Sequence, residues 1–123
     1  MMEKMEKGRC AEEIAALFLL LKGYSILARN VRPGGVEIDI VALDATTLAF
    51  VEVKFRETSY FGSPANAVDW KKRKRLLKAG LAFLKERKVE AENLRFDVVS
   101  VVLEDEGLAL EHISNAFGGG NWA

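Results

Sequence analysis

The stretch that most constrains the fold is Val36–Arg56, which has the pattern of two strands joined by a tight turn. Both halves are rich in apolar and β-branched residues, which favour extended backbone. Between them lies Asp44–Thr47 (DATT), a segment of turn-forming residues. This pattern predicts a β-hairpin, and it places four charged residues inside runs that should otherwise be core.

These four charged residues fall into two pairs. Because side chains alternate between the two faces of a strand, Glu37 and Asp39 should share a face of the first strand. Glu52 and Lys54 should share a face of the second. Charged side chains are rarely buried without a partner, so an ion or a reaction would explain this set better than chance. The alternative is a cross-strand Glu–Lys ion pair on a solvated sheet face, which would contribute little stability.

The carboxylates of the hairpin are suited to a hard divalent cation. Oxygens of Asp39 and Glu52 could hold Mg²⁺ or Mn²⁺, with Glu37 as a further candidate ligand. Such a metal would lower the pKa of a bound water and neutralise charge that builds up on a phosphate. Lys54 should point the same way as Glu52, where it could orient the attacking water or stabilise the transition state. The sequence does not distinguish these two roles.

Length and composition narrow the class of protein. A chain of 123 residues predicts a single domain over residues 1–123, with flexible ends at 1–7 and 114–123. The 18 basic and 18 acidic residues balance, so any nucleic-acid binding must come from a local patch. One cysteine and one histidine argue against a disulfide, a zinc site or a histidine-based triad. With no signal peptide and no apolar run that spans a bilayer, we expect a cytoplasmic protein without a membrane segment.

Residues 8–22 have the apolar spacing of a helix, closed by Gly23. Its later turns are apolar nearly all round because of Leu17, Leu19 and Leu20, so we expect a heavily buried helix. Glu12 could be a metal-site partner or a general base. It could equally be a first-turn acid that favours the helix dipole, as could Glu13, and periodicity does not separate the two residues.

The remaining patterns predict a strand at 24–30, a turn at 31–35, a helix at 64–87 and strands at 94–103 and 108–113. The order is helix, three strands, helix, two strands, which predicts an α/β domain with a mixed sheet flanked by helices. The second helix should bury Val68, Leu77, Leu81 and Leu84. Arg95 and Asp97 should share a strand face, where they could form a structural ion pair.

A dense run of positive charge begins the second predicted helix. Five consecutive cations cover every side of a helix, so some should lie beside the hairpin, where a phosphate backbone would relieve their repulsion. The alternative is a solvated basic face. We add two arginines that flank the hairpin strands. The predicted nucleic-acid-binding residues are Lys71, Lys72, Arg73, Lys74, Arg75, Lys78, Arg32 and Arg56.

An acidic residue followed, about a dozen residues later, by Glu-x-Lys resembles the signature of the restriction-endonuclease-like, or PD-(D/E)xK, nucleases. The wider sequence resembles the small bacterial YraN-like family, which is similar in fold to archaeal Holliday junction resolvases. The segments that carry the resemblance are Gly8–Glu12, Gly23–Leu27, Arg29–Asn30, Glu37–Asp39, Phe50–Arg56, Phe61–Gly62, Arg95–Val99 and Asn115–Phe117. One departure is Val36, where the family usually has a glycine.

The resemblance implies a restriction-endonuclease-like fold and a Mg²⁺-dependent endonuclease that acts on DNA, including branched or structured DNA. It also favours Glu12 as a catalytic acid beside Asp39, Glu52 and Lys54, because resolvase-like nucleases carry an acidic residue on the first helix. Resolvases cut two strands symmetrically, so the resemblance further implies a homodimer. Two alternatives stay open, namely a nucleic-acid-binding module that does not cut and a protein–protein adaptor.

Overall fold

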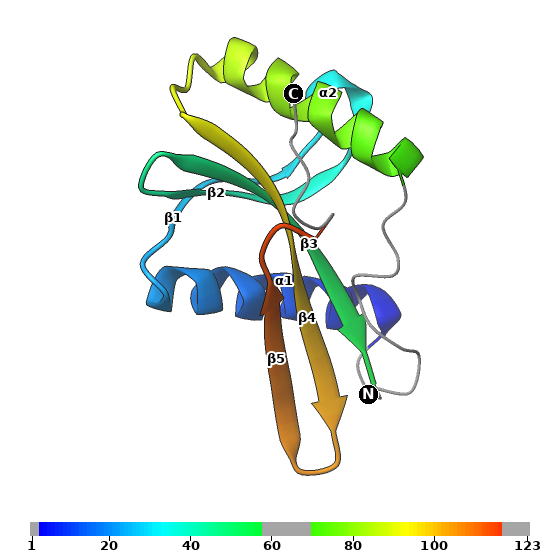
Figure 1. The fold of residues 1–123 in the computed structure, drawn as a ribbon. Coiled ribbons are helices and arrows are strands. Elements are labelled where there is room, and N and C mark those ends of the chain that lie inside the picture. The colour runs from blue at the N-terminus through cyan, green and yellow to red at the C-terminus, as the bar shows by residue number, and fades with distance from the viewer. Residues whose placement is uncertain (1–2, 58–69, 117–123) are drawn as a thin grey trace.

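A five-stranded mixed sheet lies between two helices in the structure, a computed structural model that describes residues 3–57 and 70–116 (Figure 1). The predicted order of helices and strands is confirmed. The elements are α1 (Lys4–Leu21), β1 (Ser25–Val31), a 3₁₀ turn η1 (Pro33–Gly35), β2 (Ile38–Asp44), β3 (Thr47–Arg56), α2 (Trp70–Arg87), β4 (Asn93–Glu104) and β5 (Gly107–Ile113).

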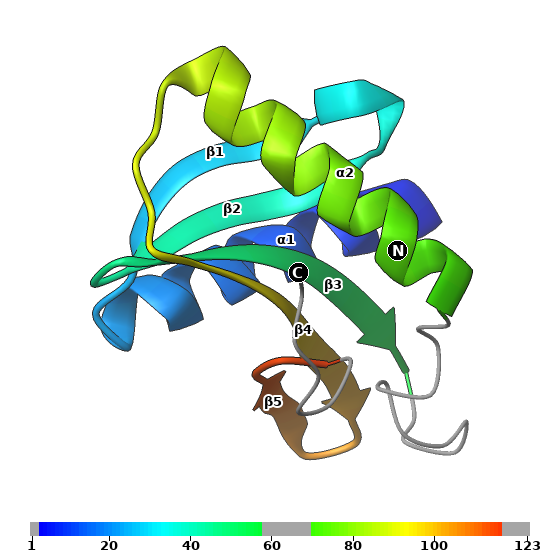
Figure 2. The same ribbon diagram turned by 45° about the horizontal axis from the view of Figure 1, so that its top comes forward.

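The strands lie in the sheet in chain order, β1-β2-β3-β4-β5. Neighbouring strands are antiparallel except β3 and β4, which are parallel. A parallel pair needs a long crossover connection, and α2 lies within the segment that joins β3 to β4. The rotated view shows α1 on one face of the sheet and α2 on the other (Figure 2). The molecule is therefore an α/β protein with a helix–sheet–helix layering.

The β2–β3 hairpin has the predicted two-residue turn, in which Asp44 pairs with Thr47. Ala45 in this turn has φ +53°, the left-handed conformation that tight hairpins require. The register pairs Ile40 with Val51. It therefore places Asp39 beside Glu52 at the end of the hairpin away from the turn.

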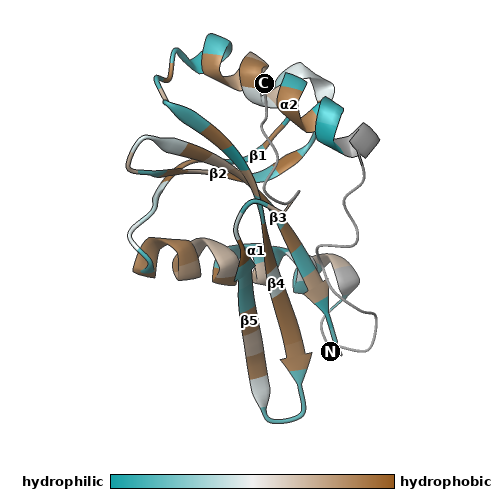
Figure 3. Cartoon of the chain, viewed as in Figure 1, coloured by the Kyte–Doolittle hydropathy of each residue, from teal (hydrophilic) through white to brown (hydrophobic). Residues whose placement is uncertain are grey.

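Helix α1 begins at Lys4, before the predicted start at Gly8, and only one of its faces is buried. Small side chains of Ala11, Ala15 and Ala16, with Leu19, pack against the sheet. The prediction of a heavily buried helix was wrong, because nothing in the described residues covers the outer face. That face exposes Leu17, Leu20 and Leu21 by 60, 51 and 86%. Figure 3 shows these apolar turns towards the C-terminal end of α1.

Helix α2 packs through a stripe that matches the predicted one in part. Ala79, Gly80 and Phe83 are buried, and the predicted Leu84 packs against the same core cluster. Leu81 is 56% exposed, so Leu81 was wrongly assigned to the core. The helix comes so close to β3 that a Cβ on Gly80 would lie 2.9 Å from the ring of Phe50. Phe50 in turn contacts Phe83 edge-on at 5.8 Å.

Some sequence-based expectations lie outside the described residues. These are the start of the second helix at 64–69 with Val68, the segment Phe61–Gly62 that contributes to the resemblance, and the tail from residue 117. Within the described part of the chain, neither helix is long and apolar enough to cross a membrane.

Candidate functional site

A cavity of about 350 Å³ lies on the α2 side of the sheet, at the end of the hairpin away from its turn. Its wall brings together five parts of the chain that are distant in sequence: the start of β2, the middles of β3 and β4, the first half of α2, and Ala116 after β5. The charged residues among them are Glu37, Asp39, Glu52, Arg75 and Asp97. The crossover through α2 is thus what places a cation of the basic run opposite the carboxylates of Asp39 and Glu52.

Asp39 lies where the two faces of the molecule meet. Its Oδ2 accepts a hydrogen bond from the backbone N–H of Val53 at 2.8 Å, which fixes the carboxylate against β3. Besides the first cavity, Asp39 lines a second one of about 500 Å³ on the α1 side, together with Glu12. One carboxylate therefore faces both cavities, with Glu52 on one side and Glu12 on the other.

Burial and neighbouring charge disfavour ionisation of this group. Burial raises the pKa of Asp39, and the nearby Glu52 and Glu37 raise it further against the effect of the Val53 hydrogen bond. Burial also raises the pKa of Glu12, and the charge of Asp39 adds to this against the effect of Arg29. The Glu12 and Asp39 carboxyl groups also interact directly, which raises the pKa of Glu12 and lowers that of Asp39.

Glu52 and Lys54 point the same way, as predicted, and Lys54 Nζ lies 3.5 Å from Glu52 Oε1. The side chains are 26% (Lys54) and 31% (Glu52) exposed, so the pair is partly shielded from water. A Glu–Lys ion pair therefore exists, but within one strand rather than across two. It holds an ammonium group beside a carboxylate that lines the cavity.

Glu37 does not lie in a strand, because β2 begins at Ile38. The strand alternation used to place it beside Asp39 therefore does not apply. Glu37 still lines the cavity, and its exposed carboxylate is 3.6 Å from Arg32. It is thus a peripheral group, already paired with one of the predicted phosphate-binding arginines.

The donor set fits a hard divalent cation, although not as a closed cage. Within residues 3–57 and 70–116, no three acidic, histidine or cysteine side chains are grouped closely enough to hold a metal by themselves. Mg²⁺ commonly takes only one or two carboxylates and keeps several waters. Asp39 and Glu52 meet that requirement. The pKa of Asp39 is raised by its burial and by the neighbouring carboxylates, and a bound cation would offset both effects.

Most of the predicted nucleic-acid-binding cations belong to α2. Arg75 lines the cavity, whereas Lys74 and Lys78 are exposed on α2. Lys71, Lys72 and Arg73 belong to the first turns of the same helix. Arg56 ends β3, two residues beyond Lys54. Glu13 is exposed and lines neither cavity, unlike Glu12.

A second charged cluster lies on the α1 side, around Asp97. The predicted Arg95–Asp97 pair is confirmed, with Nε and a terminal nitrogen of Arg95 at 2.9 and 3.0 Å from the two carboxylate oxygens. His112 joins it unpredicted, with Nε2 at 2.8 Å from Asp97. A lone histidine on an edge strand gives no sequence signal of this contact. The β4–β5 register, which brings the two residues together, becomes visible only in the structure.

Fold and site together define an α/β protein with a carboxylate-lined cavity on a mixed sheet, bordered by a basic helix. Residues 11–101 match the family described as "Uncharacterised protein family UPF0102". The chain belongs to this family.

Similar proteins from bacteria match over nearly their whole lengths. A UPF0102 protein of Syntrophus aciditrophicus is 41% identical over 117 residues, covering 95% of this chain and 92% of the relative. One from Chlorobium phaeobacteroides is 42% identical over 116 residues, covering 89% and 92%. One from Geobacter sulfurreducens is 44% identical over 111 residues, covering 89% and 87%. Their names state a family and no activity.

Proposed function

We propose that this protein is a Mg²⁺- or Mn²⁺-dependent endonuclease of the restriction-endonuclease-like class that hydrolyses phosphodiester bonds in DNA. The observation that carries the proposal is Asp39, a half-buried carboxylate with a raised pKa, held beside Glu52 on the wall of a cavity. Perturbed acids in a cavity are typical of functional sites. The Glu-x-Lys resemblance of the sequence supports the same class.

Asp39 and Glu52 are the residues that would hold the metal. When bound, the metal would supply a water of lowered pKa and neutralise charge on the phosphate. Lys54 would hold its ammonium beside this pair, where it can donate hydrogen bonds to a phosphate oxygen or the attacking water. Glu12 orients Asp39 from the α1 side through their direct interaction. The Val53 N–H fixes the other edge of the same carboxylate.

The nucleic-acid part of the proposal depends on α2. Arg75 is on the cavity wall, and the exposed Lys74 and Lys78 extend positive charge along the helix away from it. A phosphate backbone that followed these cations would pass the carboxylates. Branched DNA as the substrate, and a homodimer that cuts it, are proposed from the likeness to resolvases.

A second function is favoured by one observation. Lys54 is already paired with Glu52, and no third ligand completes the metal group in the described part of the chain. A nucleic-acid-binding module that does not cut would have these features and would use the same α2 cations.

The test is cleavage of linear, single-stranded and branched DNA with Mg²⁺ or Mn²⁺ by wild type, Asp39→Asn and Lys54→Ala. Asp39→Asn should lose metal binding and cleavage together, because it removes the charge that holds the cation. Lys54→Ala should lose cleavage, by a factor of about 100 or more, and retain metal. Both variants should bind DNA like the wild type. A wild type that binds DNA but cuts none of these substrates would instead support the binding module.

A further inference from the structure

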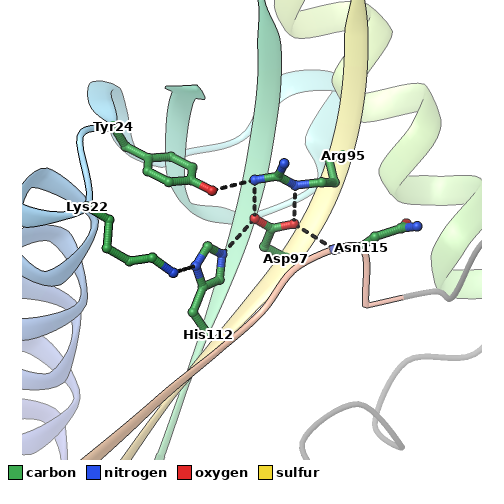
Figure 4. Close-up of polar contacts among 6 residues, drawn as sticks. All are labelled: Lys22, Tyr24, Arg95, Asp97, His112 and Asn115. Carbon is green, nitrogen blue, oxygen red and sulfur yellow. Dashed lines mark hydrogen bonds and ion pairs between the residues drawn. The ribbon is translucent and has the colours of Figure 1, made fainter. Parts of the chain in front are cut away.

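The Asp97 cluster joins parts of the molecule that are far apart in sequence. Figure 4 shows Lys22 and Tyr24 from the segment between α1 and β1, Arg95 and Asp97 from β4, His112 from β5 and Asn115 from the turn after β5. The side chain of Asp97 is fully buried, and that of His112 is 2% exposed. The proposed chemistry uses none of these side chains, so it leaves the cluster unexplained.

The hydrogen bonds of the cluster define the state of each group. Lys22 Nζ lies 2.5 Å from Nδ1 of His112, and an ammonium can only donate. His112 therefore accepts at Nδ1 and donates from Nε2 to Asp97. Asp97 also accepts two hydrogen bonds from Arg95 and one from the backbone N–H of Asn115 at 2.9 Å. Arg95 is itself held by the hydroxyl of Tyr24 at 2.6 Å.

The hydrogen bond from Asn115 N–H to Asp97 connects the cluster to the candidate site, because Asn115 precedes a residue of the cavity wall. Strand β5 ends at Ile113, which pairs with Val98, so the earlier part of β4 has no partner from β5. The turn after β5 covers this edge, because Asn115 N–H donates to Asp97 and Ala116 N–H donates to the carbonyl of Phe96 at 2.7 Å. Ala116 then lines the cavity that holds Asp39 and Glu52.

Asn115 is held through its backbone and not through its side-chain oxygen. Its φ is +53°, a left-handed conformation that is uncommon outside glycine but that asparagine adopts more readily than other residues. Its buried Oδ1 has no hydrogen-bond partner among the described residues, which costs free energy. The bond from its N–H to the buried carboxylate of Asp97 is therefore a main restraint on the turn.

We infer that Asp97 is a positioning residue for the candidate site, which it serves by holding Asn115 and Ala116 in place as one wall of the cavity. This inference rests on the proposed function. Asp97 is itself one of the residues that line the cavity, but its carboxylate is fully buried and is occupied by hydrogen bonds from Arg95, His112 and Asn115. Its effect on catalysis passes through the turn after β5.

Hydrogen exchange tests the positioning without any cleavage. In Asp97→Asn, the amides of Asn115 and Ala116 should exchange at least tenfold faster than in the wild type, and also faster than the β2 amides of the same variant, which the loss of global stability will accelerate too. Asp105→Asn, an equivalent change in the exposed β4–β5 turn, should leave all of them unchanged. Turn amides of Asp97→Asn that exchange at the wild-type rate, or no faster than the β2 amides of that variant, would overturn the inference.

Ala116→Pro tests the same turn if Asp97→Asn does not fold, because it removes the N–H that bonds to Phe96 and disfavours the left-handed conformation of Asn115 before it. With Asp97 and His112 intact, kcat should fall about tenfold or more, since small displacements of a wall disturb substrate alignment. Mn²⁺ affinity should stay within twofold of the wild type. Wild-type kcat and KM in this variant would exclude the positioning role and leave the proposed nuclease function intact. A wild-type protein that cleaves no DNA would instead contradict the nuclease function, and with it the catalytic site that Asp97 is inferred to serve.

Discussion

At the scale of single residues, the half-buried Asp39 and the buried Asp97 behave in opposite ways. Burial raises the pKa of both, but only Asp97 receives enough hydrogen bonds, from His112, Arg95 and Asn115, to bring its pKa below the usual value. One is therefore satisfied within the protein, whereas the other leaves an electrostatic cost that a cation could relieve. This contrast gives each residue a different dependence of stability on pH.

Replacing Asp39 by Asn should stabilise the metal-free protein at neutral pH, by about 0.5–2 kcal/mol. The pKa of Asp39 is raised in the folded state, so its stabilising contribution is present below the unfolded value of 3.8 and is lost as pH rises through the folded value. Asn keeps an oxygen for the Val53 N–H and carries no charge. Thermal unfolding of both proteins from pH 4 to 8 measures the effect.

The difference between the two melting temperatures should shrink towards pH 4. Saturating Mn²⁺ should raise the melting temperature of the wild type and not that of Asp39→Asn. A wild type that is clearly the more stable protein at pH 7 without metal would identify Asp39 as a structural ion-pair partner.

Replacing Asp97 by Asn should destabilise the protein by about 3–5 kcal/mol, because it leaves the buried guanidinium of Arg95 without its counter-charge. The pKa of Asp97 is lowered in the folded state. Its contribution is therefore present above the unfolded value of 3.8 and is lost as pH falls through the folded value. Urea unfolding at pH 7 and below pH 4 should show the loss at pH 7 and a smaller difference in acid. An equal loss at both pH values would mean that packing, not charge, is what the substitution removes.

At the scale of elements, the sequence pattern predicts the structure of the β2–β3 hairpin more completely than it predicts the buried faces of the helices. The turn at Asp44–Thr47 and the strands on either side of it were predicted because their signals are local. The buried faces of the helices were predicted only in part, because leucines occur nearly all round the later turns of α1, and because Leu81 of α2 lies outside the stripe of Ala79, Gly80 and Phe83. Which leucines are buried depends on what lies opposite, and Leu21 and Leu81 face no described element.

Close packing of α2 on the sheet yields a prediction about glycine. Gly80→Ala should destabilise the protein by about 1–3 kcal/mol, although alanine favours helices, because the new Cβ would lie 2.9 Å from Phe50. Gly8→Ala in α1 is the matched control, since its Cβ would meet nothing within 4 Å. That change should stabilise by about 0.5–1 kcal/mol. Chemical denaturation of both variants measures the contrast, and a neutral or stabilising Gly80→Ala would show that Phe50 can move aside.

The candidate site shows the same division between local and distant information. Asp39, Glu52 and Lys54 were singled out because they interrupt apolar strands within one hairpin. The cavity wall from Arg75 and Ala116 could not be predicted, because it depends on the path of the crossover and of the turn after β5. Sequence spacing contains no direct record of either path.

At the scale of the whole molecule, charge is balanced in sum and uneven in position. The chain carries 18 basic and 18 acidic residues, yet the N-terminal half of α2 has cations and no acid. The acids Glu104, Asp105 and Glu106 are exposed around the β4–β5 turn. A polyanion would therefore be attracted to the N-terminal half of α2 and repelled by the β4–β5 turn.

Replacing Lys71, Lys72 and Lys74 together by Ala should weaken DNA binding for all sequences, because phosphate contacts carry no sequence information. The slope of log affinity against log salt should fall by about 0.9 for each phosphate that the variant no longer neutralises. Lys85→Ala, near the other end of the helix, should change neither quantity. Fluorescence anisotropy over a salt series measures both. An unchanged slope in the triple variant would mean that the basic turns of α2 are solvated and do not contact DNA.

The parallel pairing of β3 with β4 has a consequence for synthesis of the chain. Glu12, Asp39 and Glu52 all leave the ribosome before β4, which begins at Asn93. Until β4 arrives, β3 is the open edge of a three-stranded sheet, with apolar side chains and unpaired backbone groups exposed. The strand that carries the Glu-x-Lys motif is thus the part of the nascent chain most exposed to misassociation, and completing its protection requires nearly the whole protein.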